Sequence, residues 1–147
     1  MAEVSAPFDS SAGESLFAAA CARAELAAST DDDGAGVAAA ALTASGRELV
    51  GVWVDAMVDS ACLCAETGPI CEAHQTNDPI VASVCVRSTD AGGAIVLPAC
   101  GVCQERLVVF GADVMVAVGR ETDGASEATV WRSLTELRPS PWWDAVD

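Results

Sequence analysis

Residues 37–66 read VAAAALTASGRELVGVWVDAMVDSACLCAE, and this stretch decides the fold. Small apolar residues over Val37–Leu42 indicate a strand, and Thr43-Ala44-Ser45-Gly46 is typical of a turn. Arg47–Val54 indicates the returning strand. The stretch therefore predicts a β-hairpin with small side chains on its first strand.

The same stretch ends in Cys64-Ala65-Glu66, at the entrance of a helix that we predict over Ala61–Gln75. Gly68-Pro69 falls in the first turns of this helix, where proline costs least. The segment thus brings a thiol and a carboxyl group close to a helix N-terminus.

The rest of the chain alternates strands and helices, apart from a polar loop at Thr30–Gly36. Ser11 and Glu14 have the spacing of a capping box at the start of the first helix. The pattern predicts one α/β domain over residues 1–147 with helices on both faces of a mixed sheet. Further helices are expected from about Ser11 to Ser29, over Cys100–Phe110 and at Ser133–Leu137, and further strands over Ile80–Arg87, Ala94–Leu97, Val114–Val118 and Ala128–Trp131.

A second cysteine motif follows in Pro98-Ala99-Cys100-Gly101-Val102-Cys103. Thiolates at a helix N-terminus are stabilised by the helix dipole and by free backbone N–H groups. Cys100 and Cys103 can therefore bind one metal ion, and Cys64 supplies a third sulfur. Three protein ligands leave the fourth tetrahedral position of zinc open to water, which is typical of a catalytic zinc site.

Glu66 stands two residues after Cys64. From there its carboxylate can carry protons at the open position without binding the metal. Because zinc lowers the pKa of water toward neutrality, the pattern predicts a hydrolytic enzyme with Glu66 as its catalytic acid and base.

These motifs resemble the signature of the cytidine deaminase family, C-x-E followed by P-C-x-x-C. The family's hairpin pattern, V-G-A-A-L-x-T-x-x-G-R-x-x-x-G, is similar to residues 37–51 without a gap. The thirteen-residue step from Gly51 to Cys64 also agrees, and Leu134–Pro139 resembles the family's E-L-L-P segment. The resemblance covers residues 36–143.

The resemblance implies a three-layer α/β/α fold with a five-stranded mixed sheet, one zinc ion per subunit, and a homo-oligomer, a tetramer or a dimer. It implies hydrolytic deamination, in which Glu66 protonates a ring nitrogen and then the departing ammonia. The backbone N–H of Ala65 would hold the ring carbonyl. Trp142 occupies the position of an aromatic residue that reaches a neighbouring active site, and residues 139–147 are expected at a subunit interface.

The substrate-binding motifs depart from the family. Members that take cytidine have N-x-E after the second strand, with both side chains on the ribose hydroxyls, whereas this chain has Trp53-Val54-Asp55. The aromatic residue before the first strand is Ala35, and the arginine that commonly follows the C-A-E glutamate is Thr67. We therefore expect Trp53 and Asp55 to bind another amino-substituted heterocycle, with Trp53 stacking where ribose would lie.

Other cysteines and the single histidine have structural interpretations. Cys62 could replace Cys64 as a ligand, but the family spacing favours Cys64. Cys21 and Cys85 are predicted to be core residues. His74 follows Cys71 by three residues, a spacing that can bind a metal. Both residues lie beyond the turn that carries Cys64, so we interpret His74 as a partly exposed structural residue.

The net charge of the chain limits the kinds of partner that it can bind. The 147 residues include 22 acidic and 7 basic side chains, for a formal net charge of −15. Such a surface repels phosphate backbones and forfeits counterion release, so we expect no nucleic-acid partner. Apolar runs are too short for a membrane span. No signal peptide is visible, and we expect a cytoplasmic protein with a flexible segment at residues 1–10. An odd number of cysteines then favours metal binding over disulfides.

The sequence thus predicts a zinc-dependent hydrolytic deaminase of a small amino-heterocycle: a cytidine-like nucleoside, a free base or a blasticidin-like compound. The alternative is a catalytically inactive, zinc-stabilised binding module. Glu66 separates the two, because a purely structural zinc site needs no carboxylate beside an open position. A polynucleotide deaminase is disfavoured by the charge.

Overall fold

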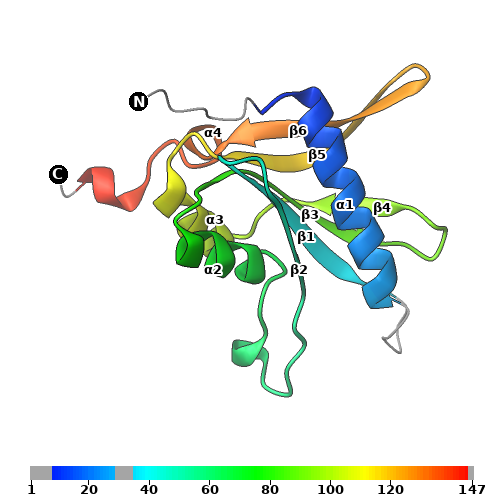
Figure 1. Ribbon diagram of the computed structural model, residues 1–147, viewed down its shortest axis with the longest axis horizontal. Helices are drawn as coiled ribbons and strands as arrows, with labels where there is room; N and C mark the ends of the chain where they lie inside the picture. The colour runs from blue at the N-terminus through cyan, green and yellow to red at the C-terminus, as the bar shows by residue number, and fades with distance from the viewer. Residues whose placement is uncertain (1–7, 29–34, 146–147) are drawn as a thin grey trace.

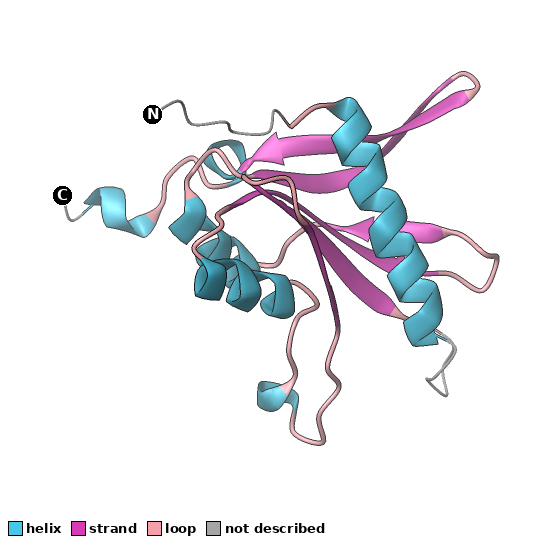
Figure 2. Cartoon of the chain, in the orientation of Figure 1, coloured by secondary structure: helices cyan, strands magenta, loops and turns pink. Residues whose placement is uncertain are grey.

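A six-stranded mixed sheet forms the centre of the protein in the computed structural model, which describes residues 8–28 and 35–145 (Figures 1 and 2). The strand order is β2-β1-β3-β5-β6, with β4 paired to β3. Only β3 and β5 run parallel among the described pairs. The strands are β1 (Val37–Thr43), β2 (Glu48–Val52), β3 (Ile80–Ser88), β4 (Ala94–Leu97), β5 (Met115–Asp123) and β6 (Ser126–Ser133).

Helices cover both faces of the sheet (Figure 1). The helices are α1 (Ser10–Ala28), α2 (Thr67–Thr76), α3 (Gly101–Leu107) and α4 (Leu134–Leu137), with 3₁₀ turns η1 (Asp59–Ala61), η2 (Val108–Phe110) and η3 (Trp142–Ala145). The predicted three-layer α/β/α fold is confirmed. The sheet has six strands where the resemblance implied five, because β4 also pairs with β3.

Strand β1 supplies both layers of the core, because successive residues of a strand point to opposite faces of the sheet. Ala38 and Ala40 pack with α1, whereas Ala41 packs with the cluster that contains α2 and α3. Ala39 lies in a third cluster, with Ala65. All four alanines of the strand are buried. Their methyl side chains allow the helices to approach the sheet closely from both sides. The small-residue strand predicted from the sequence is therefore present.

The first helix is capped by Asp9. The Oδ1 atom of Asp9 accepts a hydrogen bond from the backbone N–H of Ala12 at 2.8 Å, so Asp9 satisfies one of the free N–H groups. The capping box predicted for Ser11 and Glu14 is wrong, since Glu14 reaches across to β6. A capping box does exist at α4, where Ser133 and Glu136 bond reciprocally.

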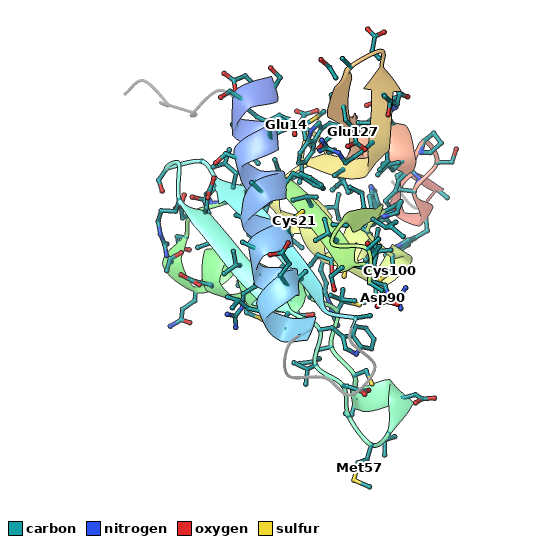
Figure 3. All side chains as sticks on the ribbon, turned by 90° about the vertical axis from the view of Figure 1, so that its right-hand side faces the viewer. Glu14, Cys21, Met57, Asp90, Cys100 and Glu127 are labelled. Carbon is teal, nitrogen blue, oxygen red and sulfur yellow. The ribbon has the colours of Figure 1, made fainter. Side chains whose placement is uncertain are left out.

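Glu14 ties α1 to the β5–β6 hairpin (Figure 3). Its carboxylate accepts from the backbone N–H of Thr129 at 2.8 Å and pairs with Arg120 at 3.1 Å. The Arg120 guanidinium also lies over the Phe17 ring, 3.9 Å from its centroid. Burial raises the pKa of Glu14, but the Thr129 N–H and Arg120 outweigh it, and the pKa lies below its usual value.

We expect Glu14→Gln to lower the free energy of unfolding at pH 7 by about 1 kcal/mol, a modest amount because water screens a half-exposed carboxylate. The folded pKa lies below the unfolded value of 4.5. The ionised carboxylate therefore stabilises the fold above that value, and this contribution is lost as the pH falls through the lower folded pKa. Urea denaturation of the unchanged protein and of Glu14→Gln at pH 7 and at acidic pH would measure this. If the difference in the free energy of unfolding between the two proteins were the same at both pH values, the prediction would be contradicted.

The β5–β6 hairpin is longer than predicted. The sequence indicated strands over Val114–Val118 and Ala128–Trp131, but the two strands pair from Met115–Ser133 out to Asp123–Ser126. The added residues are mainly polar and exposed, so they lack the apolar alternation of a half-buried strand. The two-residue turn is Gly124-Ala125, and Gly124 adopts the positive φ of 63° that the first central position of a type II′ turn needs.

Some expectations concern residues outside the described part of the chain. These are residues 1–7 of the segment predicted to be flexible, and most of the loop predicted at Thr30–Gly36. Phe8 is described, and its ring contacts Trp131 at a centroid distance of 4.7 Å. None of the helices described has both the length and the apolar character to cross a bilayer.

Candidate metal centre and active site

The floor of the site is a row of residues that faces away from α1. In the sheet register, Ala39 of β1 lies opposite Gly51 of β2 on one side and Cys85 of β3 on the other. Cys85 in turn lies opposite Leu97 of β4. Paired residues point to the same side of a sheet. The row therefore forms one surface across four strands.

Gly51 allows the turn before α2 to rest directly on this row. A Cβ atom at position 51 would lie 2.5 Å from Cδ of Pro69 and still closer to the carbonyl oxygen of Ala65. A methyl group cannot be accommodated there without moving the turn. The absence of a side chain at Gly51 therefore brings Ala65 into the core, where it is buried with Ala39 and Cys85.

Cys64, Ala65 and Glu66 precede α2 rather than lying within it. The helix was predicted from Ala61 but begins at Thr67, because the preceding residues are held by the sheet-like bridge between Val54 and Leu63. Pro69 still lies in the first turn, as expected. The turn presents the Cys64 thiol and the Glu66 carboxyl group on the same side as the row beneath it.

Three cysteine sulfurs converge at this place. The Sγ atoms of Cys64, Cys100 and Cys103 all lie within 4.8 Å of one another, and those of Cys64 and Cys100 are 3.7 Å apart. Two sulfurs bound to one zinc ion at about 2.3 Å and a tetrahedral angle lie about 3.8 Å apart. The donor set and its spacing therefore fit a zinc ion bound by three thiolates.

Backbone groups favour ionisation of one thiol. Burial raises the pKa of Cys100, but N–H groups of Cys103 and Val102 and the thiols of Cys64 and Cys103 outweigh it, and the pKa is lowered. Burial raises the pKa of Cys64 and, more strongly, that of Cys103, where the charge of Glu66 adds to the effect. Cys100 is the N-cap of α3, and its lowered pKa has the direction predicted for a helix N-terminus, whereas the raised pKa of Cys64 does not.

The Glu66 side chain lies against the thiols and is nearly inaccessible to solvent. The residue is 5% exposed. Burial raises the pKa of its carboxyl group, while its own backbone N–H, the Cys103 thiol and the charge of Arg106 lower it to a smaller extent. Arg106 donates to Oγ1 of Thr67 at 3.1 Å. A raised pKa moves this carboxyl group in the direction that favours general acid and base catalysis.

A pocket of about 170 Å³ opens beside these groups. Trp53, which is 44% exposed, lines it together with Cys64, Cys100 and Glu66. Trp53 is held there because its backbone N–H donates to the carbonyl oxygen of Val37 at 3.0 Å. The remaining lining residues are Val37, Ala65, Cys85, Leu97 and Pro98.

Two other residues with a predicted substrate role lie elsewhere in this subunit. Asp55 is not among the residues lining the pocket, and its Oδ1 lies 3.7 Å from the Cys62 thiol. Trp142 is 66% exposed and packs edge-to-face on Trp143. Its predicted role concerns the active site of a neighbouring subunit and stays a prediction.

The other cysteines do not join the sulfur cluster. Cys62 hydrogen-bonds within the loop after β2, to the carbonyl oxygen of Ala56 at 3.7 Å. Cys21 packs beside the α1 core cluster, and Cys85 is buried, so both contribute to packing as predicted. His74 is exposed and contacts the Phe110 ring at a centroid distance of 6.4 Å.

Sequence reasoning missed several residues of the site, among them Cys85, Leu97 and Arg106. Cys85 and Leu97 line the pocket although they were interpreted only as strand residues. Their shared face follows from the β3–β4 register, which no spacing in the sequence reveals. Arg106 supplies positive charge near Glu66. Its position on α3, one turn after Cys103, could have suggested this.

Several solved structures share this fold. The protein is similar to the cytidine deaminase from Bacillus anthracis, with 31% identity over 91% of each chain and a TM-score of 0.79. The cytidine deaminase from Mycobacterium tuberculosis is 26% identical, with 86% of this chain and 96% of that chain covered and a TM-score of 0.60. The enzyme from Mycobacterium leprae shares the fold, at 24% identity and a TM-score of 0.66 over 86% of this chain and 97% of that one. The chain belongs to the cytidine deaminase family. No family model matches the sequence, and a search of curated proteins finds no match.

Proposed function

We propose that the protein is a zinc-dependent hydrolytic deaminase that acts on a small amino-substituted heterocycle. One observation carries the proposal: three thiols converge at zinc-binding distances beside the buried carboxyl group of Glu66, at the edge of a pocket. Family membership supports the same chemistry, since the similar structures are cytidine deaminases.

The reaction replaces an exocyclic amine by oxygen. Water adds to the ring carbon that bears the amine, so a C–O bond forms, and the exocyclic C–N bond then breaks. The product is a ring carbonyl with a proton on the neighbouring nitrogen, and the amine leaves as ammonia. No oxidation or reduction takes place.

Each group of the site has a proposed task. Cys64, Cys100 and Cys103 would hold the zinc ion, which when bound supplies Lewis acidity that lowers the pKa of water toward about 7. Glu66 moves protons, first to the ring nitrogen and then to the leaving amine. The backbone N–H of Ala65 holds the ring carbonyl. The walls of the pocket keep bulk water from the buried carboxyl group.

We also propose that the chain assembles as a homo-oligomer, a tetramer or a dimer, in which Trp142 reaches a neighbouring site. Large apolar side chains support this, since Met57 is fully exposed at the tip of the loop after β2 (Figure 3) and Val58 is 62% exposed. Burying such side chains against a second copy is favourable. Mass measurement in solution would decide between these states and a 14.9 kDa monomer.

The proposed function predicts about one zinc ion per chain and ammonia release from at least one aminopyrimidine, aminopurine or aminotriazine. Elemental analysis would give the metal content, and a coupled ammonia assay would give turnover. Stoichiometric zinc with no ammonia from any compound would favour the alternative, a catalytically inactive zinc-stabilised module. Removing zinc with a chelator and restoring it should abolish and recover turnover.

A further inference from the structure

We infer that Arg106 is a positioning residue for the metal centre and acts through Thr67. Its hydrogen bond to Thr67 ties the turn that carries Cys64 to the helix that carries Cys100 and Cys103. This role rests on the proposed zinc-dependent function. It adds to the three ligands a pair of residues that controls how firmly the metal is held.

The three sulfurs come from two segments that are held separately. Cys100 and Cys103 belong to the start of α3, where the backbone N–H of Gln104 donates to the carbonyl oxygen of Cys100 at 2.9 Å. The helix itself therefore fixes these two residues relative to each other. Cys64 stands 36 residues before Cys100, in the turn before α2. Its distance from the other two ligands depends on how that turn lies against α3.

Apolar packing brings α2 and α3 together. Both helices lie on the same face of the sheet (Figure 1), and Ala73 of α2 shares a core cluster with Leu107 of α3. Contacts between apolar side chains are non-directional. A hydrogen bond requires a defined distance and angle, so it can set the position of one segment against the other.

Such a polar contact links the two ligand segments. Nη1 of Arg106 donates to Oγ1 of Thr67 at 3.1 Å, and the backbone N–H of Thr67 donates to the carbonyl oxygen of Cys64 at 2.9 Å. Arg106 follows Cys103 by three residues, so the two occupy neighbouring positions on the surface of α3. The contact thus runs from the backbone of Cys64 through Thr67 to the part of α3 that carries Cys103.

The charge of Arg106 also suits this place. A zinc ion bound by three thiolates would carry a net negative charge, and the guanidinium group of arginine is always positive. Arg106 is close enough for its charge to act on the Glu66 carboxyl group. A cation held there offsets part of the negative charge that the ligands bring to the site.

Zinc affinity, measured by competition with a chelator, tests this role without any substrate. Thr67→Val removes the acceptor with little change in shape, and Arg106→Gln removes the guanidinium. Each should weaken zinc binding by about 10-fold, the lower end of the usual effect of residues that orient metal ligands. Thr67→Ser keeps the hydroxyl group and is the matched control, with an affinity within about twofold of that of the unchanged protein.

The double variant distinguishes one shared contact from two separate effects. If Arg106 acts through Thr67, the combination of Thr67→Val and Arg106→Gln should weaken zinc binding no more than Arg106→Gln alone, because the contact is already broken. A combined loss of about 100-fold, the product of two independent effects, would overturn the inference. Unchanged zinc affinity in Thr67→Val would overturn it as well.

The stability of the zinc-free proteins tests for a merely structural role. Arg106 is exposed, so we expect the melting temperature of the zinc-free variants to stay close to that of the unchanged protein. The rise in melting temperature on adding zinc should become smaller. If the zinc-free melting temperature fell along with the zinc affinity, the contact would support the fold alone and the inference would be wrong.

These outcomes are distinguishable from those of the proposed function. Ammonia release together with equal zinc affinities in all variants would overturn the inference and leave the deaminase function standing. Coupled losses of zinc affinity, with no ammonia released from any compound, would support the inference and count against deamination. A chain that binds no zinc would overturn both.

Discussion

Glu66→Gln is expected to keep its zinc and its fold while ammonia release falls by about 10²- to 10⁴-fold, the usual contribution of a general acid and base. The substitution preserves the shape of a side chain that is only 5% exposed, so packing should change little. It removes the group that we propose gains and loses a proton. Metal analysis and single-turnover ammonia assays on the same preparation would measure both properties.

A matched control for this variant is Glu105→Gln, which changes an exposed glutamate on α3 that pairs with Arg138. It should leave turnover within about twofold, because Glu105 does not line the pocket and its carboxylate is half exposed. Turnover of Glu66→Gln at the wild-type rate would exclude Glu66 as the proton carrier. Loss of zinc from that variant would instead mean that the carboxyl group holds the metal site together.

Cys64→Ser is expected to abolish stoichiometric zinc binding and, with it, turnover. One of three converging sulfurs is removed, and zinc binds a hydroxyl group much more weakly than a thiolate. We expect affinity to fall by more than about 100-fold, since changes to outer partners of zinc ligands already cost 10- to 100-fold. Competition with a chromophoric chelator would give the affinity, and the thermal stabilisation by added zinc should disappear.

Cys62→Ser is the control for this experiment, because Cys62 lies two residues before Cys64 in the same loop. Its thiol bonds to the carbonyl oxygen of Ala56, a contact that a serine hydroxyl can also make. Zinc affinity should therefore match that of the unchanged protein. If Cys62→Ser lost zinc and Cys64→Ser kept it, the assignment of ligands would have to be reversed.

The architecture could be predicted from sequence wherever a pattern was local. The Val37–Gly51 hairpin followed from small apolar residues around a turn, and the Cys64 and Cys100 motifs followed from their spacing. The ends of helices and strands were harder to predict. The α2 helix starts later than expected because Leu63 pairs with Val54, a contact between segments that propensity does not encode.

The pocket was harder to predict than the metal ligands. Cys64, Cys100 and Cys103 belong to short motifs, whereas Cys85 and Leu97 share a face only through the pairing of β3 with β4. A shift of one residue in that register would place the two side chains on opposite faces of the sheet. Trp53 could be anticipated because it replaces a family residue at a fixed step after Gly51. Asp55 lies outside the pocket because of the conformation of the loop after β2, and no motif in the sequence predicts that conformation.

The structure explains why the hairpin pattern ends in a glycine, which is Gly51 in this chain. At this position the turn that carries Glu66 rests on the sheet with a hydrogen atom in place of a side chain. The distance between the sheet and the turn is thus limited by the smallest residue available. A larger residue would displace the turn and, with it, the carboxyl group that we propose as the proton carrier, so the glycine controls the depth of that group although it takes no part in the proposed chemistry.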